Sequence, residues 1–288
     1  MPSLEHGPRN GIVQKPGGLR TVQSAAVEGG TGLEFERVQG VDIPKIGLGT
    51  WQLQGNTCYR AVLSALELGY RHLDTAEIYD NESEVGRAIA DSRVARSELF
   101  LVTKVWTDHL AHPHVLRAAR GSLKRLGVDQ VDLYLVHWPR ASMPIADTMQ
   151  AMNELVEGGQ VLRLGVSNFN VEQFEAAQSA SSVKLFTNQV PFAVGRVDTS
   201  MLEYCQQNDV LLTAYSPLDR GRLARSRALK PVGDRHGKTA AQVALRWCVQ
   251  QAKVVAIPKT ASPERQQENL DLFDFELSGA DLAELARL

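Results

Sequence analysis

The sequence is poor in cysteine and contains no long apolar run. Its three cysteines, Cys58, Cys205 and Cys248, are far apart and lack CxxC spacing. We therefore expect buried apolar side chains rather than disulfides or a structural zinc site. No segment reaches the roughly 18 apolar residues that a transmembrane helix needs, and the N-terminus lacks the charged-then-apolar order of a secretory signal. These absences predict a cytosolic protein that makes no membrane contact.

The sequence also has almost no net charge, because 31 lysines and arginines oppose 33 acidic residues. Such a balance creates no global field that would attract nucleic acid or an anionic membrane. The pattern GxGxxG is absent, which argues against a dinucleotide-binding domain of the Rossmann type. We expect a monomer whose partner is a small molecule.

A histidine cluster, HxxHxH, is formed by His109, His112 and His114. Metal binding is one interpretation, but no carboxylate or cysteine accompanies these residues at ligand spacing. We interpret the segment as a loop entering a helix and expect no metal.

The chain divides into a short leader and one long repetitive region. Residues 1–32 mix glycine, proline, serine and charges without periodicity and predict a disordered tail. Residues 33–44, LEFERVQGVDIP, alternate apolar and polar side chains around Gly40, which predicts a β-hairpin. We assign residues 33–288 to one domain.

That domain alternates strand patterns with helix patterns. The eight apolar runs are residues 45–50, 71–76, 99–105, 131–137, 161–167, 186–190, 210–216 and 253–258. Helical spacing of apolar residues occurs at 57–69, 82–92, 114–127, 145–159, 171–180, 199–208 and 239–251, and two more helices are expected at 263–270 and 278–288. This order implies parallel strands and an α/β class. Eight units favour a (β/α)₈ TIM barrel, closed at its N-terminal end by the hairpin, over an open doubly wound sheet.

Four ionisable side chains fall at or just after strand ends, where barrels of this kind build active sites. Asp74 ends the second strand, Tyr79 follows in its loop, Lys104 ends the third strand and His137 ends the fourth. Each residue alone has an ordinary structural explanation, such as a turn carboxylate or a half-buried aromatic. Their joint occurrence on consecutive strands favours a catalytic set.

The set suits carbonyl reduction, which needs a proton donor at the oxygen when hydride reaches the carbon. A free tyrosine, with a pKa near 10, donates slowly at neutral pH, and a neighbouring ammonium would lower that pKa. We predict Tyr79 as general acid, Lys104 as the cation that lowers its pKa, Asp74 as the counter-ion of the lysine, and His137 as the group that orients the carbonyl.

The surrounding motifs resemble those of the aldo-keto reductase superfamily, namely LDTAEIYDNESEVG, VTKVW and LYLVHWP. The resemblance extends from Phe35 to Leu288 and looks nearest to bacterial members that reduce 2,5-diketo-gluconate or methylglyoxal. It implies NADPH-dependent reduction of small aldehydes, ketones or 2-oxoaldehydes, with the same four catalytic residues.

The cofactor should be held at the ends of the later strands, because hydride transfer needs one face of the nicotinamide fixed. Ser167, Asn168 and Gln189 offer amide and hydroxyl groups for the carboxamide, and Tyr215 could stack on the ring. The resemblance adds Ser216 and Leu218 along the pyrophosphate. The alternative is that these side chains only satisfy loop backbone.

The segments IPKT and PERQQEN predict the choice of cofactor. Lys259, Thr260 and Arg265 supply two cations and a hydroxyl that suit a 2′-phosphate, and Glu268 and Asn269 could bind the adenine. NADPH is therefore preferred over NADH, with use of both left open. The alternative is a solvated basic loop with ordinary helix capping.

Three tryptophans, Trp51, Trp106 and Trp138, also fall at strand ends and predict an aromatic substrate pocket, with plain packing as the alternative.

Two features depart from the family pattern: Pro191 stands where an acidic residue is common, and the sequence ends at Leu288, where many members continue into a loop over the pocket. Pro191 predicts a substrate-side loop that differs from the family, and the ending at Leu288 predicts a more open and less selective site.

Two other functions fit the same fold. The chain could be a cofactor-binding sensor or channel-associated subunit with little turnover, although the complete catalytic set argues against it. It could also be an aldolase that forms a Schiff base on Lys104. A lysine paired with Asp74 would be protonated and hence a poor nucleophile.

Overall fold

The computed structural model describes residues 33–142 and 144–288. Its main sheet contains eight parallel strands in the sequential order β3 to β10. A parallel bridge from Ile46 to Ala256 joins the two edges and closes the ring, so the predicted TIM barrel is confirmed and the open sheet is excluded. The strands are β3 (Leu48–Gly49), β4 (His72–Asp74), β5 (Phe100–Val105), β6 (Leu133–Val136), β7 (Leu164–Ser167), β8 (Thr187–Pro191), β9 (Leu211–Tyr215) and β10 (Val254–Ala256).

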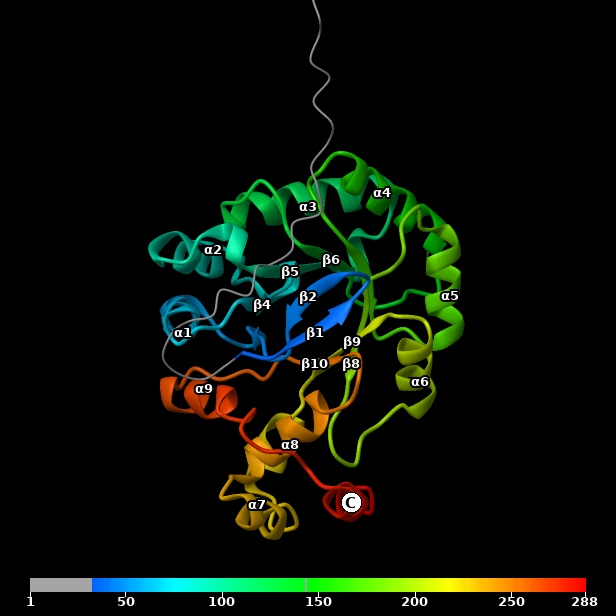
Figure 1. Cartoon of the computed structure of the whole chain (residues 1–288). Helices are drawn as coiled ribbons and strands as arrows, with labels where there is room; N and C mark the ends of the chain where they lie inside the picture. The colour runs from blue at the N-terminus through cyan, green and yellow to red at the C-terminus, as the bar shows by residue number, and fades with distance from the viewer. Residues whose placement is uncertain (1–32, 143) are drawn as a thin grey trace, which may run out of the picture.

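Helices surround the ring of strands, as Figure 1 shows in a view along the barrel. They are α1 (Gly55–Glu67), α2 (Glu82–Asp91), α3 (His112–Leu126), α4 (Ile145–Glu157), α5 (Val171–Ala180), α6 (Thr199–Gln207), α7 (Lys230–His236), α8 (Ala240–Val249), α9 (Pro263–Leu270) and α10 (Gly279–Leu285). In the described part of the chain, none of them combines the length and apolarity needed to cross a bilayer. The tail predicted for residues 1–32 lies outside the described residues, and the domain boundary at residue 33 stays a prediction.

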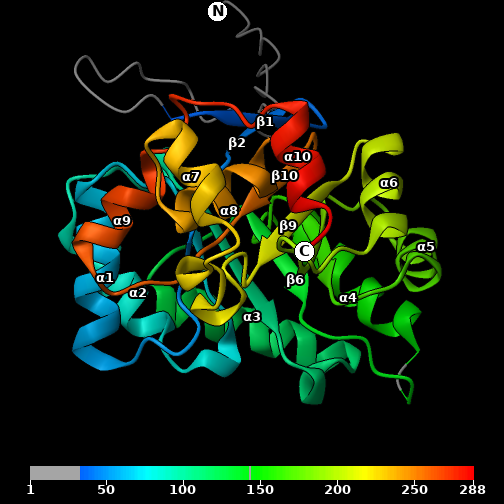
Figure 2. The ribbon, with the colours of Figure 1, turned by 90° about the horizontal axis from the view of Figure 1, so that it is seen from below.

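The predicted hairpin is formed by β1 (Phe35–Val38) and β2 (Val41–Pro44), which lie across one opening of the ring in Figure 1 and at one end of the barrel in Figure 2. Gln39 and Gly40 both have positive φ, as a two-residue type I′ turn requires. The apolar side chains of the hairpin pack with residues of several barrel strands in one buried cluster: Val38, Val41, Ile43, Phe100, Val102, Leu133, Leu135, Phe186, Leu211 and Val255. The hairpin therefore plugs the N-terminal end, as predicted.

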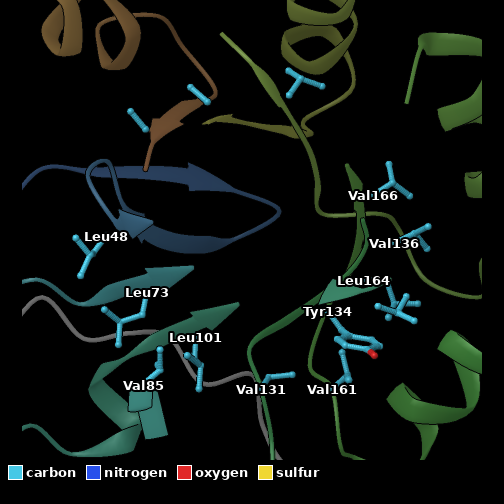
Figure 3. Close-up of a cluster of buried hydrophobic side chains, with 14 of the residues drawn as sticks. Leu48, Leu73, Val85, Leu101, Val131, Tyr134, Val136, Val161, Leu164 and Val166 are labelled. Carbon is cyan, nitrogen blue, oxygen red and sulfur yellow. The ribbon is translucent and has the colours of Figure 1, made fainter. Parts of the chain in front are cut away.

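A second, larger cluster fills the space between strands and helices. Figure 3 shows Leu73, Leu101, Tyr134 and Val136 among its members, on the outer side of the strands. Side chains of one strand alternate between faces. On β5, Leu101 belongs to this outer cluster and Val102 to the inner one, so Lys104, two residues later, returns to the inside of the barrel.

The loop after β9 differs from the prediction. A single helix was expected between the last two strands, but the structure adds α7 and two short 3₁₀ turns before α8. The segment is rich in arginine and lacks helical spacing of apolar residues, so its sequence pattern is weak. Leu223, Leu229 and Val232 become buried through contacts with distant residues of α8 and α10. Tertiary packing therefore orders a segment that local pattern left undefined.

The three cysteines are unpaired and buried, as predicted.

Candidate active site

Asp74 and Lys104 form a buried ion pair inside the C-terminal end of the barrel. The Nζ atom of Lys104 lies 2.5 Å from Oδ1 of Asp74 and donates to the backbone oxygen of Thr75 at 2.8 Å. Strand alternation directs both side chains inward from neighbouring strands. Burial lowers the pKa of Lys104, and the carboxylate of Asp74 acts in the opposite direction. The lysine thus has a fixed partner and no exposed surface.

Gln189 holds the other oxygen of the same carboxylate. Its Nε2 donates to Oδ2 of Asp74 at 2.7 Å, although the two residues are 115 positions apart. Both oxygens of Asp74 are therefore engaged. The orientation of this carboxylate depends on three strands, β4, β5 and β8.

Tyr79 and His137 meet above this pair. The Tyr79 hydroxyl lies 3.4 Å from Nε2 of His137, and the ring of Trp106 packs edge-on against the same imidazole at 5.1 Å between centroids. Burial and the charge of Lys104 lower the pKa of His137 to about 3. The imidazole is therefore neutral at physiological pH, and with Nε2 protonated it can donate to a carbonyl oxygen.

The relation between Tyr79 and Lys104 differs from the prediction. The ammonium lies 5.1 Å from the centroid of the Tyr79 ring, and the described residues show no hydrogen bond between it and the hydroxyl. Burial, followed by the charges of Asp74 and Tyr215, raises the pKa of Tyr79. The expected lowering is therefore wrong for this arrangement, because burial disfavours the phenolate and the carboxylate of Asp74 adds to that effect. The phenol keeps its proton.

The residues predicted to bind the nicotinamide gather on one side of this group. Asn168 donates to the backbone oxygen of His137 at 3.0 Å and to the Ser167 hydroxyl at 2.9 Å, and it accepts from the Tyr215 hydroxyl at 2.8 Å. The Ser167 hydroxyl donates to the backbone oxygen of Gln189 at 2.7 Å. Within the described residues, Oε1 of Gln189 has no hydrogen-bond partner, so it remains available to accept from a carboxamide.

The side chains predicted to bind the adenosine end lie after β10. Lys259 and Arg265 are exposed and form no ion pair within the described residues, whereas Thr260 is buried and its hydroxyl accepts from the backbone N–H of Ser262 at 3.1 Å. Two exposed cations without ion-pair partners, beside a loop held by its own hydrogen bond, suit the binding of a phosphate group. Glu268 accepts from the Thr239 hydroxyl at 2.6 Å. Asn269 is buried.

Comparison with known proteins supports one family. The aldo/keto reductase family model matches residues 45–288, most of the chain. The chain belongs to the aldo/keto reductase family. It is 40% identical over 250 residues to an aldo-keto reductase of Mycolicibacterium smegmatis and to a glyoxal reductase of Bacillus subtilis, covering 86% of this chain and 90% of each relative.

Solved structures agree with this membership. The crystal structure of a provisionally named 2,5-diketo-D-gluconic acid reductase B is 40% identical, with a TM-score of 0.86, covering 88% of this chain and 91% of the other. The aldose reductase of Schistosoma japonicum is 34% identical with a TM-score of 0.84, covering 88% and 92%. The predicted resemblance is therefore confirmed. The chain is an NAD(P)H-dependent reductase.

The tryptophans of this aldo/keto reductase are not equivalent. Trp106 contacts His137, whereas Trp51 and Trp138 are exposed at strand ends, and the guanidinium of Arg220 lies 5.6 Å from the Trp51 ring centroid. Their pocket role stays a prediction. Ile78, which the sequence did not single out, is 48% exposed beside Tyr79.

Two of the clustered histidines pair with carboxylates. His109 Nδ1 lies 3.1 Å from Glu77, and His112 Nε2 lies 2.7 Å from Glu154. Residues 33–142 and 144–288 contain no group of three or more side chains that could hold a metal ion.

The free energy of unfolding is expected to fall between pH 6.5 and 5. Burial lowers the pKa of His72 to about 4 and, together with Lys104, that of His137 to about 3. The unfolded chain, with ordinary values near 6.5, therefore binds protons that the folded chain excludes, which costs about 3 kcal/mol over this range. Urea unfolding at stepped pH measures the change. The His72→Gln variant should retain about half of it, and an unaltered pH dependence would contradict this assignment.

Proposed function

We propose that this enzyme reduces small aldehydes, ketones or 2-oxoaldehydes to alcohols with hydride from NADPH, and that Tyr79 is the general acid. The observation that carries this proposal is the meeting of the Tyr79 hydroxyl and His137 Nε2 directly above the buried pair of Lys104 and Asp74. The names of the glyoxal and diketogluconic acid reductases among its relatives support the substrate class.

When bound, the reduced nicotinamide supplies hydride to the carbonyl carbon. His137, neutral and protonated on Nε2, orients the carbonyl oxygen by donating a hydrogen bond. The Tyr79 hydroxyl gives its proton to that oxygen, completing the alcohol. Lys104, held against the Tyr79 ring by Asp74, stabilises the negative charge left on the phenol. Gln189 keeps Asp74 oriented toward the lysine and presents its free oxygen to the carboxamide.

A panel of carbonyl compounds, followed by the absorbance of the reduced nicotinamide, tests this function. We expect turnover of methylglyoxal and glyoxal with NADPH. Tight NADPH binding with turnover below about one per minute across the panel would instead support a sensor. Covalent trapping of a carbonyl substrate by borohydride would support an aldolase. The burial and pairing of Lys104 argue against imine formation, because a protonated amine is not a nucleophile.

Preference for NADPH is expected to depend on Lys259 and Arg265. Charge-assisted hydrogen bonds to the 2′-phosphate are worth about 1.5–3 kcal/mol each. Each alanine variant should therefore raise the NADPH dissociation constant about 10-fold or more and change NADH binding less than about 2-fold. Fluorescence titration with both cofactors measures this difference. Arg120→Ala, on the outer helix α3, is the matched control, and equal losses for both cofactors would contradict the assignment.

The monomeric state and the cytosolic location stay predictions.

A further inference from the structure

Glu77 lies where two loops of the proposed active site meet. It is the first residue of the 3₁₀ turn Glu77–Tyr79, and its side chain is only 8% exposed. Its Oε1 accepts the backbone N–H of Trp106, and both carboxylate oxygens lie near Nδ1 of His109, at 3.1 and 3.2 Å. One carboxylate therefore connects the turn that carries Tyr79 to the loop that follows β5.

We propose that Glu77 is a positioning residue for the Tyr79–His137 pair and that His109 is its second partner. The proposal rests on the function proposed above. Glu77 does not contact the reacting groups. It acts by joining the two segments that enclose them.

The rings around His137 explain why this connection matters. Tyr79 packs against the imidazole at 5.5 Å and 75°, and Trp106 packs against it at 5.1 Å and 81°. The imidazole thus contacts one ring from each of the two segments that Glu77 joins. A displacement of about 1 Å of the Tyr79 turn would change the contact between its hydroxyl and His137, and one of the Trp106 loop would remove a ring that packs against the imidazole. Misplacement of this size costs about 100-fold in rate.

Other contacts secure the Tyr79 turn on its opposite side. Gln54 donates to the backbone oxygen of Tyr79 at 2.8 Å, and the buried amide of Asn81 donates to the backbone oxygens of Thr50 and Leu53 at 2.9 and 2.8 Å. These bonds join the turn to the loop after β3. Glu77 supplies the connection toward β5, where Lys104 and Trp106 lie.

A carboxylate suits this position. The acceptor of a buried backbone N–H is stronger when it is charged, and a histidine donating to the same group adds a charge-assisted bond. His109 belongs to the HxxHxH cluster, but its partner lies in the Tyr79 turn, whereas the partner of His112 lies in α4. Of these two histidines, His109 therefore helps to position the Tyr79 turn, whereas His112 holds α4.

The test compares Glu77→Ala with Glu77→Gln by steady-state kinetics on methylglyoxal and by fluorescence titration with NADPH. We expect Glu77→Ala to lower kcat about 30- to 100-fold, with KM and the NADPH dissociation constant changed less than about 2-fold. Glu77→Gln should stay within about 3-fold of wild type, because its amide oxygen still accepts from Trp106. A purely structural role would lower the melting temperature of both variants without this difference in kcat.

Glu98→Ala is the matched control. Glu98 also lies in a 3₁₀ turn, accepts a backbone N–H, from Ala95 at 2.9 Å, and lies 3.7 Å from Arg71, but it precedes β5 at the opposite end of the barrel. Its kcat should equal that of wild type.

His109→Ala keeps the proposal testable if Glu77→Ala does not fold, because this side chain is 46% exposed. Its kcat should fall about 3-fold without loss of NADPH binding. A folded Glu77→Ala variant with the kcat of wild type would overturn the inference. If Glu77→Ala does not fold, a wild-type kcat in His109→Ala would overturn it. Failure of the proposed function is separate, since it would appear as activity retained by Tyr79→Phe.

Discussion

Replacing Tyr79 by phenylalanine is expected to lower kcat for carbonyl reduction by about 100- to 10,000-fold. The change removes only the hydroxyl that lies 3.4 Å from His137, so the proton donor is lost while the ring still packs against the imidazole. Because the pKa of Tyr79 is raised, the phenol is protonated throughout the neutral range and its loss should matter equally from pH 6 to 9. Single-turnover mixing of the NADPH complex with methylglyoxal measures the effect.

The control for this variant is Tyr59→Phe, which removes a phenol hydroxyl that donates to Asp91 on the outside of the barrel. Its kcat should match wild type. NADPH should bind Tyr79→Phe as tightly as the wild-type enzyme, since the cofactor contacts proposed for Ser167, Gln189 and Lys259 remain. A Tyr79→Phe enzyme with the wild-type rate would show that another group donates the proton.

Replacing Lys104 by methionine is expected to lower the free energy of unfolding by about 3–5 kcal/mol and to reduce kcat by at least about 100-fold. Lys104 is fully buried and its ammonium lies 2.5 Å from Asp74. The variant leaves a buried carboxylate with hydrogen bonds from Gln189 but without its cation. Urea unfolding at pH 7.5, followed by circular dichroism, measures the stability, and the activity is measured on the folded fraction.

The double variant Lys104→Met/Asp74→Asn separates the two losses. Removing the unpaired charge should recover about 2 kcal/mol or more of stability, while kcat stays low because the cation beside Tyr79 is still missing. If Lys104→Met destabilised the protein by less than about 1 kcal/mol, the assignment of a buried ion pair to Lys104 and Asp74 would be contradicted. Recovery of activity in the double variant would remove Lys104 from the mechanism.

Much of the site could be predicted because most of its catalytic residues lie at the ends of parallel strands. Asp74, Lys104 and His137 come at the ends of consecutive strand patterns, and parallel strands place such positions at one rim. Because side chains alternate between the two faces of a strand, Lys104 points inward once Val102, two positions earlier, is known to lie inside the barrel.

The contacts that tune these residues could not be predicted in the same way. The pKa of Tyr79 depends on its burial and on its distance from the carboxylate of Asp74, and both are set by the tertiary structure. Gln189 was expected to bind only the carboxamide, and its bond to Asp74 appears only when β8 and β4 are placed in one ring. The sequence did not indicate a role for Glu77, because its partners Trp106 and His109 are 29 and 32 residues away in the chain.

The amino-acid sequence by itself determined the order of strands and helices, the hairpin plug and the identity of the four residues at the rim, because hydrophobic periodicity and turn residues act over a few neighbours. Only the tertiary structure decided which atoms of those residues meet, that the Tyr79 phenol stays protonated, and that the arginine-rich segment before α8 folds into α7. These outcomes depend on burial and on distances between segments remote in the chain, and both quantities arise when the barrel closes.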